Sequence, residues 1–325
     1  MTDKSAEKRA ARVWRPDLQP AWTDFMAGGH RREIWLRYWV SDVASGLFDH
    51  LVHYGLRLGS IDFCSSIGDK LGRGMGMRGH KVAVARTKVA LSALRPEMSE
   101  MEIQDTVARL WGHIGRAMTE LSVLDRLIPR NRIDIAGKEA LAEAGKVGPV
   151  IVLGLHLGNW ETIGPALVHL GLDIHAFYEP PRNRFKHAIA RSARLRYGMV
   201  LLPRGAAGAR PAMRVLQKGA CLALFADEYL NQEVMGPSLG RPIRTDNNIG
   251  YTLRLARRTG ARIFLAYSLR SEGCHHRVTF IPFDLGSKED LEEAAARING
   301  ILSPVVLDHL DQWYTLHEIR EPWSP

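Results

Sequence analysis

The sequence predicts an α/β fold, with a mostly parallel central sheet flanked by helices and a helical N-terminal portion before it. After Gly148-Pro149, short aliphatic runs alternate with amphipathic stretches, and the runs are apolar at successive positions, as in strands buried on both faces. Gly219 and Gly260 lie where helix-ending glycines belong. With 325 residues, 46% of them hydrophobic, the chain can fill one large core or two small ones.

The first part of the chain is expected to be a lead-in followed by helices. Residues 1–30 are charged and contain prolines and a glycine pair, which predicts a flexible segment. Between residues 34 and 58, large apolar side chains recur at roughly helical spacing. Such a stripe usually packs on a core, and a membrane-interface helix is the alternative. We therefore predict a helical portion over 31–130, an α/β core over 131–325, and one structural unit over 31–325.

The clearest helix lies in MSEMEIQDTVARLWGHIGRAMTELSVL, residues 98–124. Ser99 and Glu102 form a capping-box pattern at its start, and apolar side chains follow at helical spacing. Upstream, the glycine-rich GRGMGMRG at 72–79 superficially suggests nucleotide binding, but it follows a helical region rather than a strand. We interpret it as a loop.

The core alternates strands with helices, as a parallel sheet requires. The predicted strands are VIVLGL (150–155), IHAFY (174–178), MVLL (199–202), CLALFA (221–226), RIFLAYSL (262–269) and VTFIPF (278–283). The predicted helices lie near 160–170, 184–197, 208–218 and 246–259. From about Lys288 the pattern is again helical, with an interruption at Pro304.

Charge and cysteine content narrow the class of protein. Forty-four Lys and Arg against 35 Asp and Glu give a formal net charge of +9, which favours acidic partners such as phosphorylated lipid, nucleic acid or an acidic carrier protein. Cys64, Cys221 and Cys274 lie far apart without a CxxC pair, so a reducing cytosol is expected rather than a disulfide scaffold or zinc ribbon. The sequence shows neither a signal-peptide pattern nor an apolar stretch of about 18 residues, so we expect a chain that is neither exported nor membrane-spanning.

The segment LHLGNWETIG, residues 155–164, carries the candidate catalytic pair. His156 follows an aliphatic run, and Glu161 comes five positions later, across Gly158-Asn159. Five positions on an ideal helix separate two side chains by about 140°, so the pair could meet only across a strand-to-helix turn. There, a glutamate that accepts the Nδ1 proton would leave Nε2 free to take a proton from a hydroxyl or amine. The alternative is a satisfied core histidine with an unrelated helix carboxylate.

The sequence lacks the motifs of other kinds of functional site. There is no H-E-x-x-H, and the remaining histidines, including His275-His276, form no recognisable ligand set, so no metal is predicted. A G-x-S-x-G elbow is also absent. The basic residues are dispersed and form no recognition motif, so nucleic-acid binding is not expected.

The surroundings of His156 resemble a known family. GPVIVLGLHLGNWETIG, residues 148–164, resembles the H-x-x-x-x-[DE] signature of the bacterial lipid A late acyltransferases, the lauroyl and myristoyl transferases. Further blocks follow in the family's order, namely FYEPPRNRF, RLRYG, LQKGACLALFADE and GYTLRLARRTGARIFLAYSLR. The resemblance covers about residues 80–320, with Asp227-Glu228 in place of the usual Asp-Gln and MGPSLGRP in place of the usual Phe-Phe-Gly segment.

The resemblance implies a glycerolipid-acyltransferase-like fold and an acyltransferase activity. The expected reaction moves a fatty acyl chain from an acyl carrier protein thioester to a hydroxyl of a lipid A precursor, by direct attack and without an acyl-enzyme. It implies His156 as the general base and Glu161 as its orienting partner.

Four further residues are expected to bind substrate or to position it. Arg194 matches the family's arginine and is expected to stabilise the thioester oxyanion or bind a phosphate, an exposed helix cation being the alternative. Asp227 matches the family's aspartate and is given a structural or ligand-positioning role. Asn183 and Arg182 are expected to contact the substrate, with ordinary surface-loop residues as the alternative.

The resemblance also implies partners and a location. No cofactor is expected beyond the donor, which is an acyl carrier protein thioester or acyl-CoA. The expected partners are the acyl carrier protein, an anionic lipid acceptor and the cytoplasmic face of the bacterial inner membrane, which the chain would contact peripherally, first through residues 34–58. Two alternatives stay open. One is an acyltransferase for a lysophospholipid, an amino-acid lipid or a phosphatidylinositol mannoside, and the other is an inert acyltransferase-like protein that binds acidic lipid or carrier protein.

Overall fold

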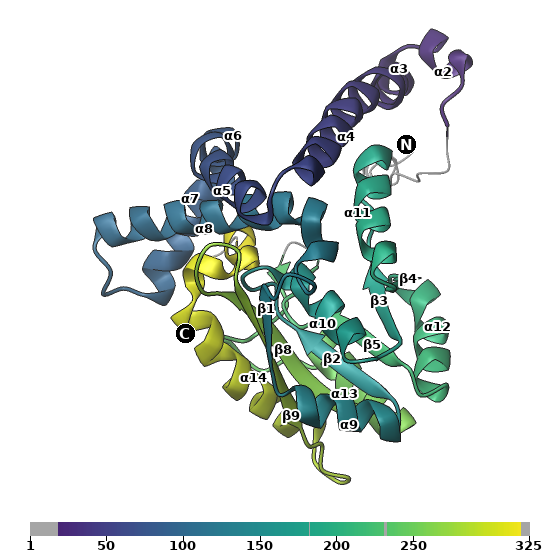
Figure 1. Cartoon of the computed structure of the whole chain (residues 1–325), viewed down its shortest axis with the longest axis vertical. Coiled ribbons are helices and arrows are strands. Elements are labelled where there is room, and N and C mark those ends of the chain that lie inside the picture. The colour runs from purple at the N-terminus through teal and green to yellow at the C-terminus, as the bar shows by residue number, and fades with distance from the viewer. Residues whose placement is uncertain (1–18, 182, 231–232, 320–325) are drawn as a thin grey trace, which may run out of the picture. The chain divides into compact units, whose positions relative to one another are not determined.

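The computed structural model describes residues 19–181, 183–230 and 233–319 (Figure 1). The chain divides into two compact units, each of which is discontinuous in sequence. Unit 1 comprises Met1–Leu58 and Glu179–Ser192, and unit 2 comprises Gly59–Tyr178 and Ala193–Pro325. The predicted single unit over residues 31–325 stays a prediction.

Unit 1 is helical and exposes most of its large apolar side chains. Its elements are α2 (Trp22–Met26), α3 (Gly29–Leu36), η1 (Arg37–Ser41), α4 (Asp42–Leu58) and the first part of α11 (Arg184–Arg196). The apolar stripe of α4 does not pack on a core as predicted, because Leu47, Leu51 and Leu58 are 63%, 74% and 91% exposed. The short helix α2 lies in a stretch for which the sequence predicted only a flexible lead-in.

Unit 2 is built around a seven-stranded sheet in the order β1-β9-β8-β2-β5-β3-β4. The strands are β1 (Ile133–Ala136), β2 (Val150–Gly154), β3 (Ile174–Tyr178), β4 (Val200–Pro203), β5 (Cys221–Phe225), β8 (Arg262–Arg270) and β9 (His276–Phe283). Neighbouring strands run parallel, except for the antiparallel pair β8 and β9. A separate antiparallel pair joins β6 (Tyr229–Leu230) to β7 (Glu233–Val234). The predicted fold class is confirmed, although β1 was not predicted from the sequence.

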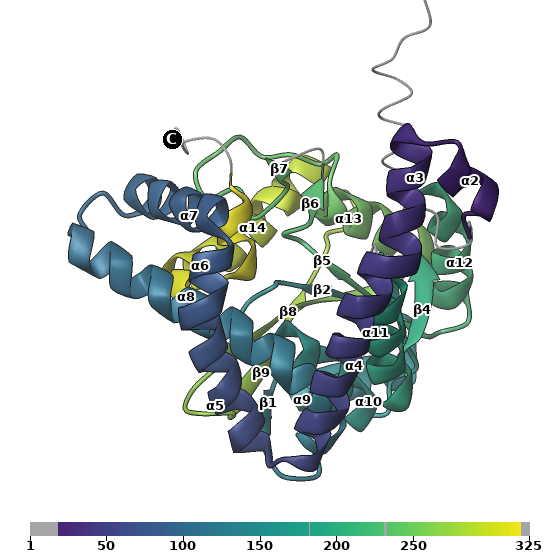
Figure 2. The same cartoon turned by 90° about the horizontal axis from the view of Figure 1, so that it is seen from above.

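Helices cover both faces of the sheet (Figure 2). On one face pack α7 (Lys81–Leu94), α8 (Glu100–Glu120), α12 (Ala206–Gln217), α13 (Asn248–Thr259) and α14 (Leu291–Asp308). On the other pack α9 (Lys138–Val147) and α10 (Ile163–His169). Successive β2 side chains alternate between these two cores, with Ile151 in the first and Val152 in the second. The central strand is therefore buried on both faces, which explains its uninterrupted apolar run.

The remaining short elements of unit 2 are α5 (Ile61–Leu71), η2 (Gly72–Gly76), α6 (Met77–Gly79), η3 (Leu121–Arg126), η4 (Trp160–Thr162), η5 (Leu310–Gln312) and η6 (Tyr314–Glu318). The segment interpreted as a glycine loop is instead helical, because η2 and α6 continue α5. A Cβ atom at Gly72 would overlap the Trp111 carbonyl of α8, so the glycine permits close helix packing. The predicted capping box of α8 is confirmed, since Ser99 N donates to Glu102 Oε2 at 2.7 Å and Glu102 N donates to Ser99 Oγ at 3.3 Å.

Candidate active site

The turn after β2 positions the candidate catalytic histidine at the carboxyl end of a central strand. Gly158 adopts φ +59°, and a Cβ atom there would overlap the Ser268 carbonyl oxygen, so only glycine fits this turn. The Asn159 side chain accepts a hydrogen bond from Glu161 N at 3.2 Å and thereby begins η4. The predicted strand-to-helix turn is present, with Glu161 in the first helical turn as expected.

His156 is paired with Asp227 rather than with Glu161. Strands β2 and β5 are parallel neighbours with Gly154 opposite Phe225, so the residues two positions beyond each strand lie side by side. His156 Nδ1 lies 2.9 Å from Asp227 Oδ1, and His156 N donates to Asp227 Oδ2 at 2.9 Å. Asp227 is completely buried, whereas the His156 side chain is 23% exposed.

Side chains of the C-terminal segment also donate hydrogen bonds to the Asp227 carboxylate. Trp313 Nε1 donates to Asp227 Oδ2 at 2.8 Å, and Thr315 Oγ1 donates to it at 3.3 Å. The backbone joins the two segments as well, since Tyr314 N donates to the His156 carbonyl at 2.9 Å. Sequence reasoning missed these residues. They lie in an aromatic stretch, DQWYTLHEIR at 311–320, and no local sequence feature connects that stretch with the end of β2.

Aromatic rings fix the plane of the imidazole. The Phe225 ring stacks on His156 with 3.9 Å between centroids and 21° between planes, and Trp160 contacts it edge-on at 5.4 Å. With Nδ1 donating to the Asp227 carboxylate, Nε2 carries the free lone pair. The arrangement can therefore accept a proton at Nε2, and the buried carboxylate stabilises the imidazolium that forms.

Glu161 instead forms an ion pair with Arg194. Arg194 Nη2 donates to Glu161 Oε1 at 2.5 Å, and Nε donates to Oε2 at 3.1 Å, a bidentate geometry. Among the described residues, no hydrogen bond joins the Glu161 carboxylate to the His156 ring, so the predicted orienting partner was wrong. Spacing along the chain favours Glu161 as the partner of His156, because it does not show which side chains a neighbouring strand brings close. Asp227 is such a side chain.

Burial and neighbouring charges shift the pKa values of Arg194 and Tyr197, which lie at this ion pair. Burial alone would lower the pKa of Arg194, but the Glu161 charge outweighs it and raises the pKa above its ordinary value. Burial raises the pKa of Tyr197 well above its ordinary range, and the negative charge of Glu161 adds to the effect. The guanidinium also lies over the Tyr178 ring, 5.0 Å from its centroid. Arg194 is thus a fixed, permanently charged group, not the exposed helix cation that was the alternative.

A buried network of charged side chains contacts the turn after β2. Asn159 Nδ2 donates to Glu120 Oε2 at 2.7 Å, and Arg270 donates to both oxygens of Glu120, at 2.6 and 2.9 Å. Although burial acts to raise the pKa of Glu120, the Arg270 charge and a hydrogen bond from His276 lower it below its ordinary value. The ionised Glu120 therefore connects the turn after β2 to α8 and β8.

The same network contains three side chains of metal-ligating type. One ligand atom each from Glu120, Cys274 and His276 lies within 4.8 Å of the others, and all three residues are buried. The Arg270 guanidinium already occupies this cluster, with Nη1 2.6 Å from Glu120 and 3.5 Å from His276 Nε2. A metal ion would have to displace this buried cation, so the donor set does not fit one.

The remaining predicted substrate contacts lie elsewhere in the chain. Asn183 belongs to unit 1, where its Oδ1 accepts from Phe185 N at 2.9 Å and its Nδ2 donates to Ser45 Oγ at 3.0 Å. These contacts cap α11 and hold it to α4. Arg182 lies outside the described residues. The substrate-binding roles of both residues stay predictions.

Comparison with known proteins identifies the family. No curated protein matches the chain. The model of the bacterial lipid A biosynthesis acyltransferase family matches residues 38–319, which includes the whole site described above. The chain therefore belongs to the bacterial lipid A biosynthesis acyltransferase family.

Proposed function

We propose that this protein transfers a fatty acyl chain from an acyl carrier protein thioester to a hydroxyl of a lipid A precursor, with His156 as general base. One observation carries the proposal. The His156 Nδ1 atom lies 2.9 Å from the buried Asp227 carboxylate, while the ring keeps access to solvent. Asp227 replaces Glu161 as the orienting partner.

This geometry supports a direct transfer between the two substrates. His156 Nε2 takes the proton of the acceptor hydroxyl as its oxygen attacks the thioester carbonyl carbon. The tetrahedral intermediate then collapses, the carbon–sulfur bond breaks, and the imidazolium returns its proton to the departing thiolate. Asp227 stabilises the transient positive charge and holds the ring in one tautomer. No enzyme nucleophile and no cofactor take part, because the acceptor attacks the donor directly.

Arg194 is proposed to act on the negative charge of the substrates. Its bidentate pair with Glu161 fixes the guanidinium, so little conformational entropy is lost when the group contacts an oxyanion or phosphate. Glu161 then serves as a positioning residue for Arg194. Two arginine nitrogens face Glu161, so a substrate anion would be met by the remaining edge of the guanidinium.

Unit 1 is the proposed contact with the membrane that holds the acceptor lipid. It exposes a run of aromatic and aliphatic side chains, among them Trp22, Phe48, Leu51 and Leu58 at 60% or more. Amphipathic helices rich in such residues bind at the boundary between headgroups and acyl chains. None of the helices in the described ranges combines the length and apolar character of a membrane-spanning helix. From the exposed apolar surface of unit 1, we propose peripheral attachment at the cytoplasmic face of the inner membrane.

The test is acyl transfer by purified protein, read by mass spectrometry. The protein is incubated with acyl carrier proteins of several chain lengths or with acyl-CoA, and with a lipid A precursor, a lysophospholipid or an amino-acid lipid. We expect one acyl increment on the lipid A precursor, and no increment with His156→Ala. Circular dichroism of the variant verifies that it is folded. Acylation of another lipid instead would reassign the acceptor, and unchanged turnover by His156→Ala would contradict the proposed base.

A further inference from the structure

The part of unit 2 around α7 carries basic residues and no acidic ones. Between Asp69 and Glu97 the sequence contains no acidic residue, yet it contains seven basic ones, Lys70, Arg73, Arg78, Lys81, Arg86, Lys88 and Arg95. A second stretch without acidic residues, 180–226, contains ten basic ones, so positive charge gathers at two places along the sequence, and this segment is one of them. It includes the whole of α7.

The basic residues of α7 have no acidic partner within the described ranges of the chain. Arg73 and Arg95, at the two ends of the stretch, form ion pairs with Asp69 and Glu97. By contrast, Lys81, Arg86 and Lys88 make no ion pair with any described residue, and none of them is completely buried. The three cations lie within about two turns of α7, and no described acidic side chain pairs with them, so the helix attracts an acidic partner.

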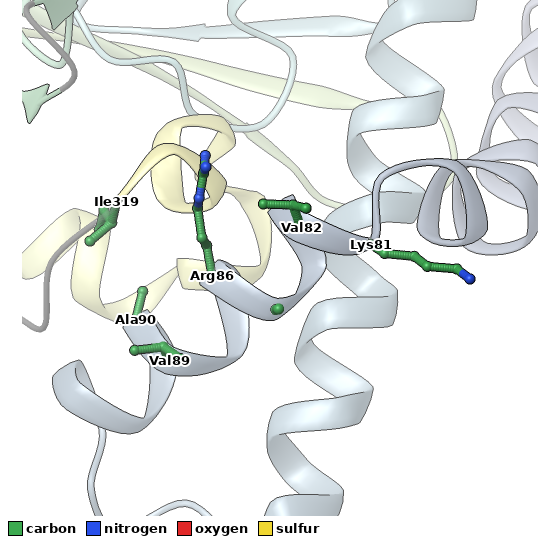
Figure 3. A pocket seen from close by; sticks show the side chains of 7 residues that line it. Lys81, Val82, Arg86, Val89, Ala90 and Ile319 are labelled. Carbon is green, nitrogen blue, oxygen red and sulfur yellow. The ribbon is translucent and has the colours of Figure 1, made fainter.

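A pocket of about 410 Å³ lies along the same helix (Figure 3). Its lining residues are Lys81, Val82, Ala85, Arg86, Val89, Ala90 and Ile319. Figure 3 shows Arg86, Val89 and Ala90 on α7, with Ile319 on the facing C-terminal segment. Val82 and Val89 are 65% and 56% exposed, and helical spacing places them on one stripe with Arg86 between them. The surface is thus an apolar hollow flanked by cations.

The hollow adjoins the segment that contacts the catalytic residues. Next to α7, the His80 ring stacks on Trp111 at 5.2 Å, and Trp111 contacts His317 at 6.0 Å. His317 contacts Tyr314 at 4.9 Å, and Tyr314 in turn lies 6.2 Å from the His156 ring. A series of packed rings therefore connects the start of α7 with the catalytic histidine.

We propose that this α7 face, defined by Lys81, Val82, Arg86 and Val89, docks an acidic helix of the acyl carrier protein. The proposal rests on the proposed function, which requires such a donor. Acidic side chains of the partner would pair with Lys81 and Arg86, and one apolar side chain would enter the hollow. A concave site favours a protruding protein side chain over a bilayer, because membrane-binding surfaces insert convex apolar residues, as unit 1 offers.

The test compares two double charge reversals within the full-length protein. Lys81→Glu with Arg86→Glu alters the α7 face. Arg210→Glu with Arg214→Glu makes the same change of net charge on exposed residues of α12, on the opposite side of unit 2 in Figure 1. Binding of fluorescently labelled acyl carrier protein is measured by anisotropy at low and high salt. We expect the α7 variant to bind at least tenfold more weakly, the α12 variant to bind within twofold of wild type, and wild-type binding to weaken with salt.

Further readouts separate the possible failures. If wild type transfers acyl chains from the carrier protein and the α7 variant does so with the same KM, the docking site is overturned while the proposed function stands. If wild type neither binds nor uses any carrier protein but transfers from acyl-CoA, the donor assignment fails and takes the docking site with it. If the α7 variant binds carrier protein normally but loses binding to phosphatidylglycerol vesicles, the face contacts membrane and the proposal is wrong. Thermal unfolding of both variants verifies that the fold is intact.

Discussion

Replacing Asp227 with asparagine tests the central pairing of the site. The carboxylate accepts hydrogen bonds from His156 N and Nδ1, from Trp313 Nε1 and from Thr315 Oγ1. An asparagine amide has nearly the same shape but offers one acceptor oxygen and one donor nitrogen. The orientation that this amide adopts decides the outcome.

The donors around Asp227 select that orientation. If the amide nitrogen took the place of Oδ2, it would face His156 N, Trp313 and Thr315, all of which donate, and each unsatisfied buried donor costs about 1–3 kcal/mol. If the amide nitrogen instead took the place of Oδ1, it would face mainly His156 Nδ1, which can accept a hydrogen bond. We therefore expect the second orientation, in which the ring proton moves from Nδ1 to Nε2. The base is then lost, and turnover should fall by about 10²–10⁴.

Two measurements check this prediction. Nitrogen-15 NMR of labelled histidine reports the tautomer of His156, and acyl-transfer assays report kcat. Glu161→Gln is the matched control, because it also replaces a carboxylate by an amide but leaves Asp227 in place. We expect the tautomer to change in Asp227→Asn and to be retained in Glu161→Gln. The opposite result, a tautomer that responds to Glu161 and not to Asp227, would refute the reasoning whatever the effects on turnover.

Three further substitutions test the surroundings of the site. Glu120→Gln leaves the Arg270 guanidinium buried without a counter-charge, so chemical denaturation should show a loss of about 3–5 kcal/mol, and a loss below about 1 kcal/mol would contradict the supporting role of the network. Burial and the nearby Arg270 charge lower the pKa of His113 from 6.5 to about 4. The unfolded chain therefore takes up the proton first, and about 3 kcal/mol of stability should be lost as the pH falls from 6.5 to 4. His113→Gln should flatten that part of the stability curve, and an unchanged curve would argue against this residue. Gly158→Ala should lower the thermal midpoint, because positive φ costs about 1–3 kcal/mol and the added Cβ meets the Ser268 carbonyl, whereas an unshifted midpoint would show that the turn relaxes freely.

Local sequence features predicted the elements on which the site is built. The predicted strands over 150–155 and 221–226 correspond to β2 and β5, because a strand buried on both faces needs continuous apolar residues. The capping box at Ser99 and the glycine turn after His156 depend on backbone geometry within a few residues. His156 could therefore be placed at the carboxyl end of a central strand from sequence alone.

Predictions from the sequence were wrong where one residue type is common in two kinds of local structure. The sequence predicts a loop at GRGMGMRG, since glycine is common in turns, but these glycines permit close packing of η2 on α8. For the apolar stripe of α4, the sequence favours packing on a core over a membrane-interface helix, yet the stripe is largely exposed. Periodicity shows that a helix has an apolar face but not what covers that face. The pocket on α7 could not be predicted for the same reason, because the C-terminal segment, far away in the sequence, forms part of its lining.

The sequence by itself determined six of the seven strands of the sheet, the position of the turn after β2 and the presence of a histidine at its start. Only the tertiary structure decided which carboxylate contacts that histidine. The parallel register of β2 with β5 places Gly154 opposite Phe225, so His156 and Asp227 emerge side by side although 71 positions separate them. Glu161, only five positions away, is turned toward Arg194 by η4. Strand pairing is a long-range property of the folded chain, and no spacing within one segment encodes it.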